Sequence, residues 1–213
     1  TDDDLKLGLY DNAHVEVWLV NWTVPSENVH LRTAILGEIS QEDGLFRAEL
    51  RGLSSLLEQR TGRTYSRQCD AVLGDAHCSV NLQQAEFKTS GSIVEITERR
   101  SIRCSGLSGF EPGWFARGQI TFTSGRNQSL ALEVSASSDN NADTIALWKA
   151  APLPLAVGDT FELTAGCDKT FATCKAKFDN HVNFRGCPHI PGSDFALSYA
   201  KSTVIHDGSP LIK

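Results

Sequence analysis

Six cysteines are the residues of this chain whose chemistry is most specific, and four of them form two close pairs: Cys69 with Cys78, and Cys167 with Cys174. An even number of cysteines permits disulfides, but a chain of 213 residues can build a core without them. Structural zinc usually takes cysteines about two to four residues apart, which neither pair matches. An iron–sulfur cluster requires only that four thiolates meet in the folded chain. Spacing alone therefore leaves disulfides, a metal site and unrelated buried thiols open.

Histidines near the cysteines offer a second kind of chemistry. His77 precedes Cys78, and His189 follows Cys187 by two residues, so both are candidate metal ligands or neighbours of ligands. Solvated loop histidines are the commoner case. Cys187 with His181 or His189 could form the nucleophile and base of a cysteine peptidase. Because the sequence offers no third group to orient the base, we expect the chain not to be an enzyme.

Charge and hydropathy exclude two classes of function. The formal net charge is −6, and no stretch carries the dense Lys/Arg stripe that binding to phosphates needs, so we expect no sequence-specific nucleic-acid partner. No apolar run approaches the roughly 20 residues of a membrane-spanning helix. The chain contains no methionine, so we expect a fragment that lacks its N-terminal part.

The elements that must position the cysteines are mostly strands. Apolar alternation and β-branched residues predict strands at 14–20, 29–36, 45–50, 91–97, 118–123, 130–135, 144–148 and 160–164. The capping-box spacing of Ser55 and Glu58 predicts a short helix at 53–59, and a second short helix is expected over 170–178. The predicted fold class is mainly β, with a β-rich segment at 1–60, a loop-rich cysteine domain made of 61–82 and 166–195, an inserted small β-barrel or sandwich at 83–165, and a tail at 196–213.

The sequence around the cysteine pairs is more specific than their spacing. The stretches YSRQCDAVLGDAHC at 65–78 and AGCDKTFATC at 165–174, followed by FDN at 178–180 and NFRGCPHIPG at 183–192, resemble the tail hub proteins of siphophages and bacterial gene transfer agents. The stretch WLVNW at 18–22 resembles the N-terminal part of the same family. The C-terminal part is also similar to the tail tip protein L of phage lambda, whose C-terminal domain holds a [4Fe–4S] cluster by two cysteine pairs.

This resemblance implies a cofactor and its ligands. The cofactor is an iron–sulfur cluster, [4Fe–4S], and its ligands are Cys69, Cys78, Cys167 and Cys174. Cys187 departs from the family pattern and stands as a spare candidate ligand. Cys104 lies in the β insert, where we expect it to act as a small buried hydrophobe. Three lysines near the second pair could offset the negative charge of a cluster: Lys169, Lys175 and Lys177.

The resemblance also implies a structural role in the tail baseplate of a virion or gene transfer agent particle that is assembled in the bacterial cytoplasm. The partners it implies are the distal tail protein, the large tail-tip or fibre-bearing protein, and further copies of the chain in a ring, as a homotrimer. Two other functions remain as alternatives. One is a tail-tip cysteine peptidase that hydrolyses the cell wall, and the other is a secreted β protein stapled by disulfides.

Overall fold

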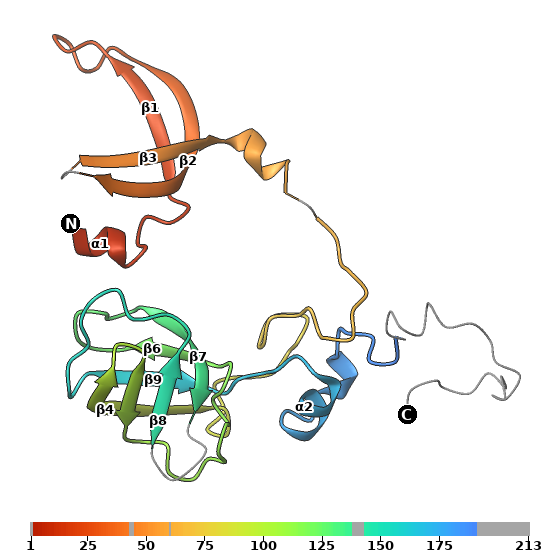
Figure 1. The fold of residues 1–213 in the computed structure, drawn as a ribbon. Helices are drawn as coiled ribbons and strands as arrows, with labels where there is room; N and C mark the ends of the chain where they lie inside the picture. Colours follow the sequence, from red (N-terminus) through yellow and green to blue (C-terminus); the bar gives the residue numbers. More distant parts are fainter. Residues whose placement is uncertain (1, 43–44, 60, 138–142, 191–213) are drawn as a thin grey trace, which may run out of the picture. The chain divides into compact units, whose positions relative to one another are not determined.

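The computed structural model describes residues 2–42, 45–59, 61–137 and 143–190 (Figure 1). The chain divides into two compact units, Thr1–Gly62 and Arg63–Lys213. Strands make up 35% of the structure and helices 10%, which confirms the predicted mainly β class. No helix within the described ranges is long and apolar enough to cross a bilayer. The predicted tail at 196–213 and positions 191–195 of the predicted cysteine domain lie outside the described residues.

The first unit is a three-stranded antiparallel sheet that follows a short helix, α1 (Asp2–Lys6). Its strands, in spatial order, are β1 (His14–Val20), β2 (Asn28–Glu42) and β3 (Leu45–Gly52). The three predicted strands are confirmed. Strand β2 extends beyond the predicted 29–36 because its second half pairs with β3, with Ile39 opposite Ala48.

The predicted capping box after β3 is wrong. The structure has a 3-10 helix at Leu53–Leu56 whose N-cap residue is Gly52, and no side chain caps it. Ser55 lies inside this helix, and its hydroxyl donates back to the Gly52 carbonyl oxygen at 2.8 Å. A hydroxyl used in this way does not accept an N–H of the first turn, so its spacing to Glu58 has no capping function.

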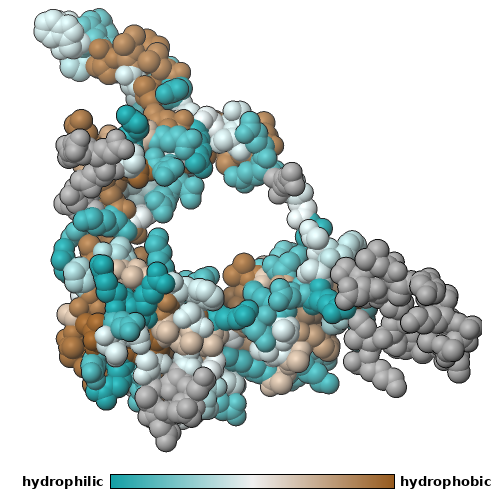
Figure 2. Space-filling view, in the orientation of Figure 1, coloured by the Kyte–Doolittle hydropathy of each residue, from teal (hydrophilic) through white to brown (hydrophobic). Residues whose placement is uncertain are grey.

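One face of this sheet carries several apolar pairs, and its end at Leu19 and Val29 is exposed. Residues directly opposite each other in an antiparallel pair share a face, and the strand register places on one face the pairs Leu19–Val29, Val15–Ala34 and Leu36–Leu50. Among the described residues of this unit, Ala34 is the only buried hydrophobic one, whereas Leu19 is 62% exposed and Val29 is 61% exposed. Figure 2 shows hydrophobic residues gathered on the surface of this unit. The sheet therefore has almost no core of its own in the single chain.

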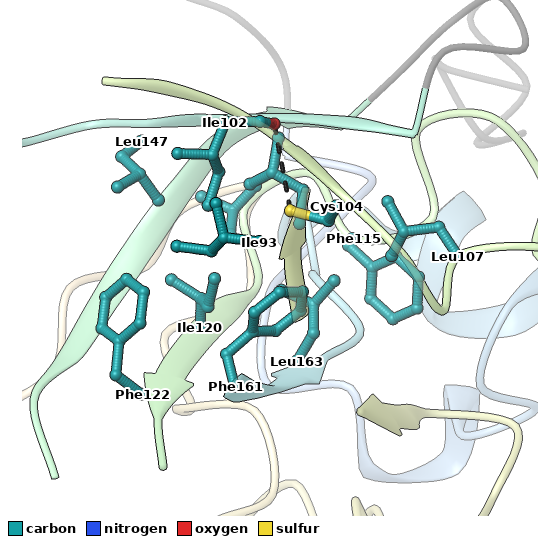
Figure 3. Close-up of a cluster of buried hydrophobic side chains, with 12 residues drawn as sticks. Ile93, Ile102, Cys104, Leu107, Phe115, Ile120, Phe122, Leu147, Phe161 and Leu163 are labelled. Atoms are coloured by element: carbon teal, nitrogen blue, oxygen red, sulfur yellow. Dashed lines mark hydrogen bonds between the residues drawn. The ribbon is translucent and has the colours of Figure 1, made fainter. Parts of the chain in front are cut away.

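The β insert of the second unit closes into a six-stranded barrel in the order β4-β5-β8-β7-β6-β9. The strands are β4 (Lys88–Glu98), β5 (Ser101–Cys104), β6 (Gln119–Phe122), β7 (Ala131–Ser137), β8 (Thr144–Leu147) and β9 (Thr160–Thr164). All but β5 match predicted strands. Alternate side chains of β6, β8 and β9 are buried, as strand geometry requires. Inward side chains of the strands form one core with Leu107 and Phe115 from the segment between β5 and β6 (Figure 3). The strand residues of this core are Ile93, Ile102, Cys104, Ile120, Phe122, Val134, Ile145, Leu147, Phe161 and Leu163.

The two ends of the barrel sequence lie side by side. Lys88, the first residue of β4, pairs with Thr164, the last residue of β9. The chain leaves the barrel at Gly166, where a Cβ atom would stand 1.8 Å from the Ala116 carbonyl oxygen, so this close approach of two backbones requires glycine. The barrel therefore returns the chain to the place where it entered.

Cys104 is buried in the barrel core, as the sequence predicts. It is 2% exposed, and its sulfur lies 3.9 Å from the Ile102 carbonyl oxygen (Figure 3). Burial, together with the nearby charge of Asp143, raises the pKa of Cys104 from 9.0 to about 12.

We expect Cys104 to make the barrel less stable in alkali. In the unfolded chain the thiol ionises near its ordinary pKa of 9.0, whereas in the folded chain it stays protonated up to about 12. The contribution of the buried thiol to the free energy of unfolding is therefore fully present below pH 9.0. It is lost as the pH rises from 9.0 to about 12. In urea unfolding from about pH 9 upward, the free energy should fall faster for the wild type than for Cys104→Ala, by up to about 1.4 kcal/mol per pH unit. Equal slopes would contradict the burial of the thiol.

Candidate cysteine site

The first cysteine pair lies on an irregular loop, residues 63–82, whose shape is set by side-chain hydrogen bonds. The Asp75 carboxylate accepts the N–H groups of Val72, His77 and Cys78 at 3.0, 2.9 and 2.6 Å. The pKa of Asp75 lies below its ordinary value, and the hydrogen bond from the Cys78 N–H is the largest cause of this shift. One carboxylate thus fixes a turn around Cys78, which is buried.

The second pair lies on the chain that leaves β9. Cys167 follows the exit glycine, and Cys174 is the buried residue of helix α2 (Phe171–Ala176), which lies within the predicted helix at 170–178. The Thr170 hydroxyl caps α2 by accepting the Thr173 N–H at 3.3 Å. The cap fixes where the helix begins and so which way Cys174 points.

The four cysteines of the two pairs meet at one small cavity. Its wall consists of Cys69, Cys78, Cys167 and Cys174 with Ala71, Leu73, Val80, Lys169, Thr170, Phe178, Asn180, Asn183 and Phe184. The N–H of Cys69 donates to the Lys169 carbonyl oxygen at 2.9 Å, which joins the two cysteine segments directly. The structure therefore brings together all four residues that the sequence resemblance implies as ligands.

Three of the four sulfur atoms receive an N–H group. The donors, with their distances to sulfur, are Arg185 N to Cys69 (3.4 Å), Lys169 N to Cys167 (3.4 Å) and the Asn180 side-chain amide to Cys78 (3.7 Å). The fourth sulfur, that of Cys174, itself donates to the Asn180 carbonyl oxygen at 3.3 Å. Because N–H donors stabilise a negative sulfur, these three contacts favour thiolates at the site.

The thiols of the second pair resist ionisation in the metal-free chain. Burial raises the pKa of Cys174 to about 11, and the charges that the other three cysteines would carry raise it as well. Burial also raises the pKa of Cys167, against the opposing effects of the N–H and the charge of Lys169. A metal cluster binds thiolates, so its binding at this site would displace protons.

The donor set of this cavity consists of four cysteine thiols. Within the described ranges, no group of three or more His, Cys, Asp and Glu side chains is placed to hold one ion. A [4Fe–4S] cluster is held by four cysteine thiolates, and four thiols around a mainly apolar cavity provide that set. All six cysteines are free, so the structure gives no support to the alternative of a disulfide-stapled protein.

Cys187, the spare candidate, lies beside the cavity and not in its wall. Its N–H donates to the Ser66 carbonyl oxygen at 2.8 Å. The preceding residue, Gly186, packs on the backbone of Gln68, where a Cβ atom would stand 2.7 Å from the nearest backbone atoms. A residue with a side chain does not fit there, so glycine lets the segment that carries Cys187 approach the loop that carries Cys69.

The candidate histidines do not belong to the cavity wall. The ring of His181 packs edge-on against Phe171, with 6.5 Å between ring centroids. In the part of the chain that the structure describes, the Cys187 sulfur makes no hydrogen bond with His181 or His189.

The three lysines near the second pair have different environments. Lys169 lines the cavity, and its ammonium donates to a backbone carbonyl of the first loop at 2.5 Å. The Lys177 ammonium donates to the carbonyl oxygens of Trp114 and, at 2.8 Å, Gly166, and it lies 4.5 Å from the centroid of the Trp114 ring. Burial lowers the pKa of Lys177 to about 8. Lys175 is exposed, whereas the charges of Lys169 and Lys177 both interact with Cys167.

Two of the residues that donate to the sulfurs, Asn180 and Arg185, carry no role in the sequence-based prediction. The signal is present, because Asn180 ends the stretch FDN and Arg185 lies in NFRG, both within the stretches that carry the family resemblance. Their function depends on side chains and N–H groups that face cysteines far away in sequence, and no local pattern shows that.

Comparisons with known proteins agree with the sequence resemblance at the level of the hub family. Residues 1–81 match the family model described as baseplate hub protein, N-terminal attachment domain, and residues 113–194 match the model described as phage conserved hypothetical protein BR0599. A chain of the solved structure "Virion of native gene transfer agent (GTA) particle" is similar at 38% identity with a TM-score of 0.86, over 98% of this chain and 72% of that chain. No curated protein matches the chain.

A chain built in this way is a structural component of a phage-like particle. At 38% identity over most of both chains, and with the hub model covering the first unit, it belongs to the family of phage-type baseplate hub proteins. This confirms the predicted resemblance to hub proteins and to gene transfer agents. The similarity to the tail tip protein L of phage lambda stays a prediction.

We expect Lys177 to stabilise the junction between the barrel and the cysteine segment. Lys177→Met should lower the free energy of unfolding by about 1–3 kcal/mol, because two carbonyl oxygens lose their donor in a half-buried place. Lys175→Met, on the same helix but exposed, should change it by less than about 0.5 kcal/mol. Urea unfolding of both variants measures the difference, and equal stabilities would show that the ammonium does not hold the junction.

Proposed function

We propose that this hub-family protein binds an iron–sulfur cluster, [4Fe–4S], through Cys69, Cys78, Cys167 and Cys174. The observation that carries the proposal is that four cysteines, from segments on either side of an entire barrel, line one mainly apolar cavity. The N–H groups directed at three of the sulfurs support thiolate ligands.

A bound cluster would supply four iron–sulfur bonds that cross-link the loop at 63–82 to the segment at 166–190. These segments contain little regular structure besides α2 and a 3-10 helix at His181–Asn183. Their apolar core is small, with Phe87, Ala165 and Phe178 as its buried residues. Packing alone therefore stabilises them weakly, and a structural role for the cluster fits this region better than redox catalysis.

The first unit supports a role of the chain in assembly. In the proposed baseplate the chain joins the distal tail protein to the large tail-tip protein. It assembles with copies of itself as a homotrimer. It has no enzymatic activity in this role. The exposed apolar end of the β1-β2-β3 sheet, at Leu19 and Val29, supports this role, because exposed apolar surface is characteristic of contact with another protein. The particle would be assembled in the bacterial cytoplasm.

Purification without oxygen should yield a brown protein with about four irons and four acid-labile sulfides per chain. Replacing any one of the proposed ligands by serine should abolish most of the iron: Cys69→Ser, Cys78→Ser, Cys167→Ser and Cys174→Ser. The measurements are iron and sulfide content and the visible spectrum of each protein.

Two further cysteines provide matched controls. Cys104→Ser and Cys187→Ser should keep the iron, because neither residue lines the cavity. Loss of iron in Cys187→Ser, with retention in one of the four ligand variants, would reassign that ligand. A colourless, iron-free wild-type protein would refute the cluster.

The apolar face of the first unit should be buried in the assembled particle. Leu19→Lys puts a charge on that face and should weaken self-association or incorporation into particles by roughly tenfold or more, since burying one leucine contributes about 1.5–3 kcal/mol. Glu16→Lys changes the charge on the opposite face and should have a small effect. Sedimentation of the purified chain and its content in assembled particles measure the change. Equal effects of the two variants would contradict the assignment of the face.

A further inference from the structure

Asn180 contacts one cysteine of each pair. Its side-chain Nδ2 donates to the Cys78 carbonyl oxygen at 2.5 Å and lies 3.7 Å from the Cys78 sulfur. Its backbone N–H donates to the Cys174 carbonyl oxygen at 3.1 Å, and its own carbonyl oxygen accepts from the Cys174 thiol at 3.3 Å. One residue thus joins the loop that precedes the barrel to the helix that follows it.

The direction of the Asn180 amide is set by Asn183. The Asn183 Nδ2 donates to the Asn180 Oδ1 at 2.7 Å, so the donor end of the Asn180 amide faces Cys78. Asn183 is held in turn, because its backbone N–H donates to the Asn180 carbonyl oxygen at 3.0 Å. Asp179, just before Asn180, has a φ of 44°, which turns the chain sharply at this point. The local backbone therefore presents the amide to the sulfur in one orientation.

Asn180 differs from the other donors at the site. The N–H groups that face the Cys69 and Cys167 sulfurs belong to the backbone of Arg185 and Lys169, so they do not depend on the side chain at those positions. The donation to Cys78 depends on an asparagine side chain. Hydrogen bonds to cluster sulfurs help to set the reduction potential, and residues that orient metal ligands affect how tightly the metal is held.

We propose that Asn180 is a positioning residue of the cysteine site: it aligns Cys78 with Cys174 and donates an N–H to the Cys78 sulfur, while Asn183 sets the direction of its amide. The consequences for a bound cluster rest on the function proposed above. The hydrogen bond to the Cys78 sulfur does not rest on it and can be tested in a chain without iron.

Four variants separate this role from general effects on the fold. Asn180→Asp keeps the size of the side chain and removes the donor, and Asn180→Leu removes the donor without adding charge. Asn183→Asp places an acceptor beside the Asn180 Oδ1, so the Asn180 amide should turn its donor end away from Cys78. The control is Asn81→Asp, since Asn81 is exposed and its Oδ1 accepts the Gln83 N–H at 3.0 Å, which a carboxylate also does.

If the wild-type chain is purified with iron, two readouts apply. Iron release to a chelator should be roughly tenfold faster or more in Asn180→Asp, Asn180→Leu and Asn183→Asp. The reduction potential should become more negative in the same three variants, because the reduced, more negative cluster loses an N–H donor. Asn81→Asp should match the wild type in both. An unchanged potential in the three variants, or an equal change in the control, would overturn the proposal.

If the wild-type chain is purified without iron, the cluster proposal fails and the Asn180 proposal is decided by the side-chain amide itself. The Asn180 Nδ2 hydrogens, followed by hydrogen exchange in NMR spectra, should exchange about 3–10-fold faster in Asn183→Asp than in the wild type, because the amide no longer donates to Cys78. Asn81→Asp should leave this rate unchanged. An unchanged rate in Asn183→Asp, or an equal increase in the control, would refute the proposal.

Discussion

The closure of the barrel by β4 and β9 is the interaction on which the cysteine site depends. The pairing of Lys88 with Thr164 and the hydrogen bond from the Ala165 N–H to the Phe87 carbonyl oxygen, at 2.7 Å, hold the first and last residues of the insert side by side. The loop with the first cysteine pair ends where the segment with the second pair begins. Four cysteines can line one cavity only because this sheet closes, since the chain between Cys78 and Cys167 would otherwise keep them far apart.

The barrel and the cysteine segments are stabilised by different physics. The barrel has a continuous apolar core in which Phe115, Phe122 and Phe161 are each at most 2% exposed. The cysteine segments depend on a small core around Phe87 and Phe178, whose rings lie 5.2 Å apart, and on polar contacts to backbone groups. A region of this kind gains most from a cross-link, which is why a cluster at the four sulfurs is physically reasonable there.

The first unit, in contrast to the barrel, has almost no buried apolar core of its own. Its strands are regular and well paired, but Ala34 is the only buried hydrophobic residue among its described residues, while Leu19 and Val29 are exposed. In the role proposed above, contacts with other proteins of the particle would cover these exposed apolar residues. The two units thus combine a surface suited to assembly with a module that carries its own core and the cysteine site.

The sequence by itself determined the mainly β class, most of the strands, the helix after Thr170 and the four cysteines, because alternation, turn residues and motif context are local properties. It did not show β5 (Ser101–Cys104), and it misread Ser55 as a cap. Only the tertiary structure decided that the insert closes on itself, that Cys187 stands outside the cavity wall, and that Asn180 and Lys177 hold distant segments. These features depend on contacts between residues that are far apart in the sequence. Strand pairing and packing between distant segments determine such contacts, and no local sequence pattern shows them.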